Sequence, residues 1–407
     1  MYNLIVIGGG AAGFFGAIRA AELHPGLRIL ILEKTTKLLA KVKISGGGRC
    51  NVTHYCLQPT LLSRHYPRGQ KILKRLFPVF HAADTIRWFA EKGVPLKAED
   101  DNRMFPVTDD SQTIINCFLA EAKRHRIDIK TQQEVTALVR ADTRWRVVVA
   151  GMEFRTEKVL IATGGHPQPQ AYEWLRKLGH SVVDPLPSLF TFNDPALHYA
   201  DLMGVAVAHA RVKIAATSFE QAGAVLITHW GLSGPAVIKL SAWAAVELAR
   251  LHYTFSVLVN WIDKTEDETR GLLLRQKEIH GKRGIHNHPL FHLPARLWER
   301  LVSEADIAPT LTWAECPNKA INKLTEWLVR CPFAIRGKTT YKEEFVTCGG
   351  VDVEEIDRQT MQSRKLPGVY FAGEVLNIDG ETGGFNFQAA WTMAEVAARA
   401  MQWAAAR

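Results

Sequence analysis

The chain of 407 residues has few cysteines, and none of them forms a C-x-x-C pair. A chain of this length can bury a large core without disulfides. Scattered cysteines are typical of reduced proteins, so we expect free thiols, no structural zinc site and a cytoplasmic location. The six residues are Cys50, Cys56, Cys117, Cys316, Cys331 and Cys348.

Long hydrophobic runs are also missing. The apolar stretch from Leu4 to Ile18 contains five glycines and no basic residue precedes it. It is shorter than the roughly 18 residues that a membrane-spanning helix needs. Hydrophobic residues make up 47% and charged residues 22% of the chain, which excludes collagen, coiled coil and disorder. We expect a soluble protein of two or three domains.

Glycine clusters are absent from the middle of the chain. None occurs between Gly165 and Gly349, whereas twelve of the 30 glycines fall in five clusters nearer the two ends. Glycine lets the backbone approach a ligand closely. We therefore expect a ligand-binding body built from both chain ends, with an insertion between them. The clusters are residues 8–10, 46–48, 164–165, 349–350 and 383–384.

The first cluster has the context of a dinucleotide-binding turn. An apolar run at 2–7 predicts a strand, Gly8 to Gly13 a tight turn, 14–23 a helix and 28–32 a second strand. In such a βαβ unit the pyrophosphate lies at the helix N-terminus. Glu33 follows the second strand and can accept hydrogen bonds from the adenosine ribose. The pattern predicts dinucleotide binding.

The far end of the chain distinguishes between FAD and NAD. Residues 368–374 predict another strand and turn, and Gly383-Gly384 opens a helix that runs to about Trp403. A second helix N-terminus would bind the far half of a long cofactor, which favours FAD. A second G-x-G-x-x-G is missing. NAD(P)H, if it is the reductant, must therefore bind transiently; alternatively, electrons come from an organic substrate and leave to oxygen.

On six sequence blocks the chain resembles the HI0933-like flavoproteins, also named for aminoacetone oxidase, within the two-dinucleotide-binding-domain flavoprotein superfamily. The resemblance runs from residue 4 to about 393, and the pair SGGGRCN and GGFNFQ is its most specific part. The blocks are residues 8–13, 45–51, 162–165, 228–236, 347–351 and 370–388.

The resemblance implies an α/β fold with three parts. A Rossmann-like FAD-binding domain would comprise 1–187 and 347–407, an inserted β-rich, barrel-like domain 188–262 and 315–346, and a small helical domain 263–314. Together with the first turn, it assigns cofactor contacts to Gly8, Gly10, Ala11, Ala12, Gly13, Glu33, Lys34, Lys41, Gly47, Gly48, Arg49, Cys50, Asn51, Val135, Thr163, Gly164, Gly165, Gly373, Glu374, Asp379, Gly384, Phe385 and Asn386.

No clear catalytic acid or base stands out, because a flavin does the redox chemistry itself. Three residues are weak candidates. Cys50 follows three glycines and Arg49, a setting that favours a thiolate, although a small residue filling a tight loop explains it as well. Arg49 could stabilise a reduced, anionic flavin or bind an anionic substrate. His229 either faces the flavin or caps the helix predicted from Pro235.

Four histidines at 280, 286, 288 and 292 lie close together in the chain. Pro289 interrupts them, and no acid or cysteine completes a tetrahedral set. We interpret the stretch as a polar loop and predict no metal site.

Acidic residues are missing between Thr35 and Ala83. Removing the ten cations of residues 34–83 from the 50 basic residues leaves 40, against 41 acidic residues, so this segment accounts for the formal charge of +9. It is either a solvated basic face or an entrance for an anion, such as NADPH phosphates or a nucleic-acid backbone. The cations are Lys34, Lys37, Lys41, Lys43, Arg49, Arg64, Arg68, Lys71, Lys74 and Arg75.

Three hypotheses for function follow. The first is an FAD-dependent oxidoreductase, NAD(P)H-linked, that acts on a small molecule; the resemblance also allows an amine oxidase that uses oxygen. The second, also implied by the resemblance, is a flavoenzyme that reduces a uridine in ribosomal RNA, with the basic segment 34–83 as its contact. The third is a flavin-binding redox sensor without turnover.

Overall fold

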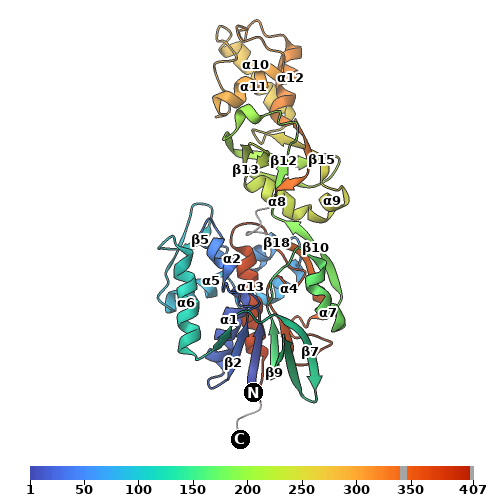
Figure 1. The fold of residues 1–407 in the computed structure, drawn as a ribbon. Coiled ribbons are helices and arrows are strands. Elements are labelled where there is room, and N and C mark those ends of the chain that lie inside the picture. Colours follow the sequence, from blue (N-terminus) through green and yellow to red (C-terminus); the bar gives the residue numbers. More distant parts are fainter. Residues whose placement is uncertain (340–345, 404–407) are drawn as a thin grey trace. The chain divides into compact units, whose positions relative to one another are not determined.

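The computed structural model describes residues 1–339 and 346–403 and divides into two compact units. One unit comprises residues 1–188 and 342–407, and the other comprises residues 189–341. The first is therefore built from both chain ends. Its helices α1 (Ala11–Leu23) and α13 (Phe385–Ala400), blue and red in Figure 1, pack against each other. The α/β fold that the sequence predicts is confirmed.

The central sheet of the first unit has the strand order β6-β2-β1-β9-β8-β7, and β19 pairs with β9. Strands β1, β2, β6, β9 and β19 pair in parallel, whereas β7, β8 and β9 form an antiparallel meander. The bounds are β1 Tyr2–Ile7, β2 Ile29–Leu32, β6 Asp128–Lys130, β7 Val135–Ala141, β8 Arg144–Val149, β9 Met152–Ile161 and β19 Val369–Phe371.

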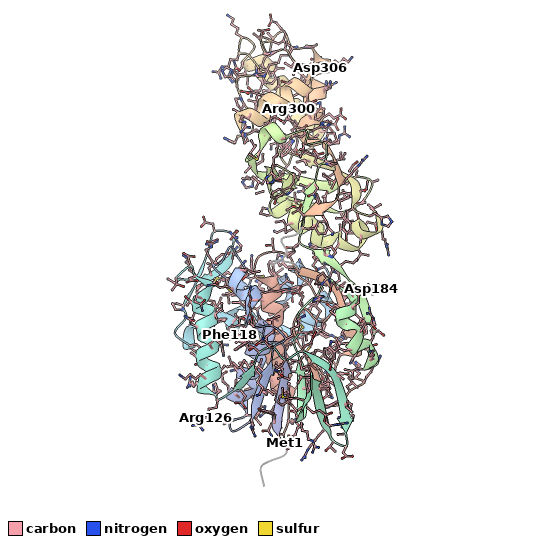
Figure 2. The ribbon with its side chains drawn as sticks, viewed as in Figure 1. Met1, Phe118, Arg126, Asp184, Arg300 and Asp306 are labelled. Atoms are coloured by element: carbon pink, nitrogen blue, oxygen red, sulfur yellow. The ribbon has the colours of Figure 1, made fainter. Side chains whose placement is uncertain are left out.

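An aromatic core fixes the helices on this sheet. Phe118, labelled in Figure 2, lies on α6 (Ser111–Arg124) and packs against Phe14 of α1, with ring centroids 6.3 Å apart. Its ring also lies 5.8 Å from Trp88 of α5 (Ala82–Glu91) and 5.5 Å from Trp391 of α13. All of these side chains are buried. Their packing in the core positions α1 and α13, and with them the N-termini of both helices.

Shorter elements connect these layers. Strands β3, β5 and β4 form a small antiparallel sheet, and β10 pairs with β18. The elements are α2 Ala40–Ile44, β3 Thr53–His54, α3 Pro59–Leu62, the 3₁₀ turn η1 Ser63–His65, α4 Gln70–Leu76, α5 Ala82–Glu91, β4 Leu96–Ala98, β5 Arg103–Pro106, the 3₁₀ turn Pro169–Tyr172, α7 Glu173–Lys177, β10 Val182–Ser188, β18 Val346–Val351 and the 3₁₀ turn Val353–Glu355.

The second unit is a seven-stranded antiparallel sheet with helices, in the strand order β16-β15-β12-β13-β14-β11-β17. Its bounds are β11 Thr191–Asn193, the 3₁₀ turn Ala200–Leu202, β12 Ala206–Ile214, β13 Glu220–Thr228, β14 Gly231–Ser233, α8 Pro235–Trp243, α9 Ala245–Arg250, β15 Thr254–Asn260, α10 Glu266–Ile279, α11 Ala295–Glu304, α12 Asn318–Val329, β16 Cys331–Arg336 and β17 Lys338–Thr339.

Helix α12 packs against both α10 and α11. The predicted boundary at residue 314 would place α12 in a different domain from α10 and α11, although α12 packs against both. The division into three domains stays a prediction. Among residues 1–339 and 346–403, no helix combines the length and the apolar character that crossing a membrane requires.

Candidate cofactor site

Four parallel strands end at the same edge of the central sheet. Gly8 follows β1, Glu33 follows β2, Ala162 follows β9 and Ala372 follows β19. In sheets of this kind, ligands bind at the carboxyl ends of the strands. The structure therefore brings together sequence blocks that lie hundreds of residues apart in the chain.

Two glycines of the first turn are required by the packing of the backbone. Gly8 has φ +114°, and a Cβ there would lie 2.3 Å from the carbonyl oxygen of Ala162. A Cβ on Gly13 would lie 2.0 Å from the carbonyl oxygen of Gly8. Around Gly10, in contrast, a Cβ would meet no atom within 4 Å. The chain thus closes tightly around Gly8 and Gly13 and leaves space at Gly10.

The N-terminus of α1 borders this space. Gly10 is its N-cap residue, no side chain caps the helix, and its first turn has no acidic residue. Uncapped amides at a helix start suit an anion, and the helix dipole adds to the attraction. These features fit the pyrophosphate of FAD.

Glu33 lies beside the same turn. Its carboxylate accepts hydrogen bonds from the amide of Gly9, at 2.9 Å, and from the amide and hydroxyl of Thr35, both at 2.8 Å. The carboxylate oxygens have about four acceptor sites, so capacity for a ribose hydroxyl remains. The amide of Gln133 binds the Glu33 carbonyl, which places Val135 nearby, and Lys34 is exposed.

Glu374 joins three of the blocks. Its carboxylate accepts from the amide of Thr347 and from Lys41 Nζ, both at 2.7 Å. A Cβ on Gly165 would lie 2.6 Å from a Glu374 carboxylate oxygen, and one on Gly373 would lie 3.0 Å from Ala12 Cβ. The loop of Thr163 and Gly164, the turn at Gly373 and the start of α1 therefore share one surface.

The SGGGRCN block meets the start of α13. Gly46, Gly47 and Gly48 all have positive φ, and a Cβ on either of the last two would meet no atom within 4 Å. With its amide oxygen toward Gly384, the Asn51 side chain accepts from the Gly384 amide at 3.0 Å and donates to the Thr53 carbonyl at 3.0 Å. Gly384 is the uncapped N-cap residue of α13. The SGGGRCN and GGFNFQ blocks are therefore in direct contact, and we call this contact the junction.

Cys50 does not have the electropositive, accessible setting that would make a thiolate. Its side chain is fully buried, and this burial raises the pKa of the thiol to about 12. The thiolate hypothesis is therefore replaced by that of a small residue filling a tight loop.

We expect iodoacetamide to leave Cys50 unmodified in the native protein at neutral pH. A pKa raised from 9.0 to about 12 lowers the thiolate fraction by roughly 1,000-fold. Peptide mass spectrometry after labelling measures this, and half-buried Cys56 is the internal comparison. Labelling of Cys50 as fast as of Cys56, without urea, would contradict the prediction.

Arg49 is not an unpaired cation. Its guanidinium lies 2.5 Å from Glu99 and 3.6 Å from Asp109, and it stacks over the ring of Phe105 at 4.0 Å. The hydrogen bond to Glu99 raises its pKa. Because two carboxylates compensate its charge, a role as an isolated positive charge next to a flavin is not supported.

Asp379 is also engaged inside the protein. Its side chain is fully buried, accepts from Arg68 Nε at 2.5 Å and from Ser188 Oγ at 2.9 Å, and forms a second bond with Arg68 Nη2. The Asp379 side chain therefore serves as a buried partner of Arg68, and a cofactor contact at this residue stays a prediction. Because Arg68 is bound to Asp379, it is not available to bind an anion.

Phe385 and Asn386 begin α13. Phe385 is buried under two histidine rings, and Asn386 bonds both the amide and the carbonyl of Gly380. One of these rings, His65, pairs with Glu381 at 3.0 Å. Nothing in the sequence pattern singled out this pair, because the two residues are 316 positions apart.

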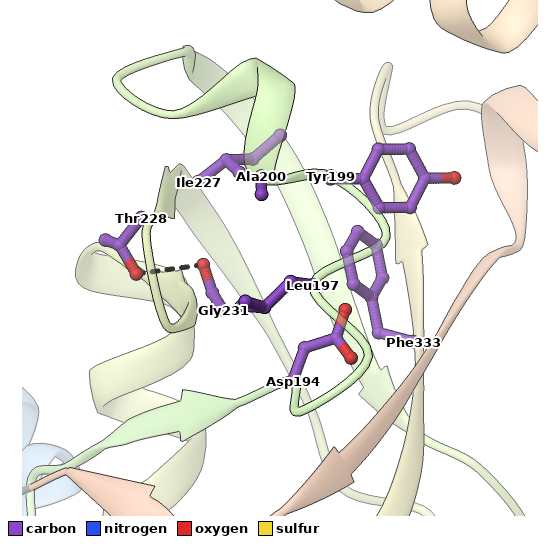
Figure 3. Close-up of a pocket in the computed structure, with 8 residues that line it drawn as sticks. All are labelled: Asp194, Leu197, Tyr199, Ala200, Ile227, Thr228, Gly231 and Phe333. Carbon is purple, nitrogen blue, oxygen red and sulfur yellow. Dashed lines mark hydrogen bonds between the residues drawn. The ribbon is translucent and has the colours of Figure 1, made fainter.

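His229 belongs to the second unit, where it is exposed in the turn between β13 and β14. The neighbouring Thr228 hydroxyl donates to the Gly231 carbonyl, which closes this turn (Figure 3). The turn borders a cavity of about 10 Å³, room for roughly one water molecule. A catalytic role for His229 stays a prediction. The cavity is lined by Asp194, Leu197, Tyr199, Ala200, Ile227, Thr228, Gly231 and Phe333.

Within the part of the chain that the structure describes, one group of three side chains has the spacing of metal ligands: Glu22, Glu121 and His125. Lys92 Nζ lies 2.5 Å from Glu22 and 3.0 Å from Glu121. An ammonium between two carboxylates makes this an ion-pair network. The four loop histidines do not form such a group.

Comparisons with known proteins agree with this geometry. The family model described as HI0933-like protein Rossmann domain matches residues 2–400. The chain is 31% identical to the ribosomal RNA dihydrouridine synthase of Escherichia coli (strain K12), over 97% of this chain and 96% of that protein. Identity to the protein of the same name from Haemophilus influenzae is 27%, over 96% of each.

A third relative is named for a bile acid and not for ribosomal RNA. The chain is 25% identical to the 3-dehydro-bile acid delta(4,6)-reductase of Clostridium scindens, over 98% of this chain and 99% of that protein. These relatives match over 96% to 99% of their own length, and the family model covers almost the whole chain. The chain therefore belongs to the HI0933-like family and is an FAD-dependent oxidoreductase.

Proposed function

We propose that this protein reduces a uridine in ribosomal RNA to dihydrouridine. The observation that carries the proposal is the full-length similarity, at 31% identity, to a ribosomal RNA dihydrouridine synthase. In this proposal the turn from Gly8 to Gly13, Glu33 and the loop from Thr163 to Gly165 bind the ADP half of FAD. The Gly46–Asn51 block and the start of α13 bind the flavin half.

The chemistry of a uracil ring suits reduction by a flavin. Its C5=C6 bond is conjugated with the C4 carbonyl, so it accepts a hydride on one carbon and a proton on the other. Reduced FAD supplies the hydride when bound. The protein must bind the RNA, orient the base and hold the proton. The reductant that we propose is NAD(P)H, which would bind transiently, because the sequence has no second dinucleotide-binding turn.

A basic face supports RNA as the substrate. Four cations of segment 34–83 have partners inside the protein: Lys41, Lys43, Arg49 and Arg68. The other six are exposed and form no ion pair with a described residue. Helix α4 buries Ile72, Leu73 and Leu76, so its remaining side chains face solvent. The basic face consists of Arg64, which precedes α4, and Lys71, Lys74 and Arg75 on α4.

This face is connected to the flavin half of the proposed site. A Cβ on Gly69, which caps α4, would lie 2.6 Å from the side chain of Ile378, and Tyr66 donates to the Phe385 carbonyl. Phosphates bound along α4 would therefore lie on the element that adjoins the start of α13. Four unpaired cations next to a redox site fit a polyanion better than a small, neutral substrate.

Replacing Lys71, Lys74 and Arg75 together with Glu should weaken ribosomal RNA binding while FAD stays bound. Each lost phosphate contact lowers the salt dependence, the slope of log Kobs against log salt, by about 0.7 to 0.9. We expect the slope to fall by roughly two to three in the triple variant. Filter binding across a salt series, with flavin absorbance as the check on the cofactor, measures both effects.

The matched control replaces three exposed cations elsewhere in the same unit, Lys123, Arg144 and Lys177, with Glu. Its charge change is identical, and it should bind RNA as the wild type does. Equal losses in the two variants would mean that net charge alone is measured. The proposed function itself fails if ribosomal RNA from a deletion strain contains no uridine that the purified, NAD(P)H-reduced protein converts to dihydrouridine.

A second candidate is reduction of a small unsaturated carbonyl compound. The name of the Clostridium scindens relative, a reductase of delta(4,6) unsaturation in a 3-dehydro compound, favours it. The reaction class is the same, addition of a hydride and a proton to a carbon–carbon double bond. Anaerobic reoxidation of the reduced protein separates the candidates: RNA should reoxidise the flavin in the wild type and poorly in the α4 variant, whereas a small enone would not distinguish the two proteins.

A further inference from the structure

A histidine–carboxylate pair lies at the start of α13. His65 Nδ1 is 3.0 Å from Glu381 Oε2, and the Glu381 amide donates to the His65 carbonyl at 2.9 Å. Glu381 is buried, whereas the His65 side chain is 33% exposed. Backbone and side chain thus fix the two residues to each other, although one belongs to η1 and the other to the loop before α13.

The imidazole ring is also fixed by stacking. It lies over the ring of Phe385 with centroids 4.3 Å apart and planes 13° apart. His54 of β3 stacks on the same phenyl ring at 4.7 Å, and the Tyr66 hydroxyl donates to the Phe385 carbonyl at 2.7 Å. These contacts hold Phe385 and the His65 ring against each other, with Nδ1 toward Glu381.

The second ring nitrogen is available. Among the described residues, His65 Nε2 has no hydrogen-bond partner. Phe385, on which the ring stacks, directly follows Gly383 and Gly384, and Arg64 of the basic face precedes His65. His65 thus stacks on the residue that follows the Gly383-Gly384 turn, and its neighbour in the chain, Arg64, belongs to the basic face.

Other proton carriers around this junction are less suited. Burial raises the pKa of Cys50 to about 12 and keeps that of Tyr66 well above its usual value. Asp379 is fully buried in its pair with Arg68. Imidazole is the side chain that exchanges a proton near neutral pH, and a carboxylate on one nitrogen fixes its tautomer and orientation.

We propose that His65, oriented by Glu381, donates the proton that completes reduction of the uracil ring; this inference rests on the proposed function. The proton leaves Nε2 and forms a C–H bond at one carbon of C5=C6, while the hydride from reduced FAD forms the other. The neutral imidazole regains a proton from water, and a reduced nicotinamide restores the two electrons. His65 is thus a catalytic residue and Glu381 a positioning residue.

The test compares His65→Gln with wild type in single turnover of reduced protein with ribosomal RNA from a deletion strain. We expect flavin reoxidation to slow by about 100-fold, within the usual range for general acid catalysis. FAD content and RNA affinity should stay unchanged. The matched control is His209→Gln, which changes an exposed imidazole on β12 of the second unit and should keep the rate. Equal rates for His65→Gln and wild type would overturn the proposal.

A readout independent of turnover tests the orientation. In the ¹⁵N-histidine protein, the Nδ1–H proton bonded to Glu381 should give a downfield resonance that His65→Gln and Glu381→Gln both lose. The pH–rate profile of wild type should fall on the alkaline side, and His65→Gln should remove that limb. The titratable groups that contact the ring are Glu381 and His54, and Tyr66 lies on the other side of Phe385; α3 has no titratable residue, and the cations of α4 are exposed.

The outcomes separate two failures. If wild type reduces no uridine at all, the proposed function fails, and the proposal for His65 fails with it. If wild type reduces uridine and neither the rate nor the alkaline limb changes in His65→Gln, only the role of His65 fails. If His65→Gln does not retain FAD, the reoxidation rate is measured with His65→Asn instead. The Nδ1–H resonance is then measured in Glu381→Gln, and a resonance that persists there contradicts the pairing of His65 with Glu381.

Discussion

Replacing Gly13 with alanine should remove FAD from the purified protein. The added Cβ would lie 2.0 Å from the Gly8 carbonyl oxygen and 3.3 Å from Val6 Cγ1, so the start of α1 must move away from β1. Neither contact is a flexible side-chain end that could give way cheaply. We expect FAD affinity to fall by at least roughly 100-fold, about 2.7 kcal/mol, measured by titrating cofactor-free protein with FAD.

Gly10→Ala is the informative partner of this variant. Its Cβ would meet no protein atom within 4 Å, so the fold should tolerate it. In our proposal the pyrophosphate lies there, and the methyl group should weaken FAD binding without lowering the stability of the cofactor-free protein.

A third glycine, far from the proposed cofactor site in the chain, provides the control for FAD binding. Gly271 lies in α10 of the second unit, and a Cβ there also meets nothing within 4 Å. Gly271→Ala should keep FAD and stabilise the helix by roughly 1 kcal/mol. If Gly10→Ala and Gly271→Ala bind FAD equally well, the pyrophosphate does not lie at the start of α1.

The parts of this fold that depend on residues close together in the chain could be predicted from the sequence. The turn from Gly8 to Gly13 lies between a strand and a helix, and the structure gives it that place. The meander of β7, β8 and β9 follows from runs of alternating and β-branched residues. These features depend on backbone geometry within a few residues, so composition and spacing suffice.

Features that depend on residues far apart could not be predicted. An electropositive neighbourhood was expected for Cys50, but its burial depends on what packs above the loop, and burial decides the pKa of a thiol. Segment 34–83 looked uniformly basic, although Arg68 is bound to Asp379, 311 positions away. The pairing of His65 with Glu381 left no local pattern for the same reason.

Removing Arg68 should unfold much of the first unit. Asp379 is fully buried and Arg68 is 15% exposed at its side chain, so Arg68→Met leaves a carboxylate inside the protein without its cation. Breaking a buried pair in this way costs roughly 3–5 kcal/mol. Chemical denaturation followed by circular dichroism and flavin fluorescence measures the loss. Arg211→Met, which removes a 38% exposed cation from Asp263 in the second unit, should cost less than about 1 kcal/mol.

The loss should also depend on pH in a defined direction. Burial already raises the pKa of Asp379 in the wild type, and Arg68 opposes this rise. Without Arg68, the folded-state pKa rises further while the unfolded value stays the same. Folding then requires proton uptake at any pH between the two values, so Arg68→Met should be less destabilised at about pH 5 than at about pH 8.

The double variant separates charge from packing. In Arg68→Met with Asp379→Asn, neither charge of this pair remains, and the amide can still accept from Ser188. Its stability should exceed that of Arg68→Met and lose most of the dependence on pH. A double variant as unstable as Arg68→Met at every pH would show that lost packing around the guanidinium, rather than the uncompensated carboxylate, destabilises the protein. In that case the Arg68 side chain would stabilise the loop before α13 by the space it fills, and its charge would contribute little to the stability of the fold.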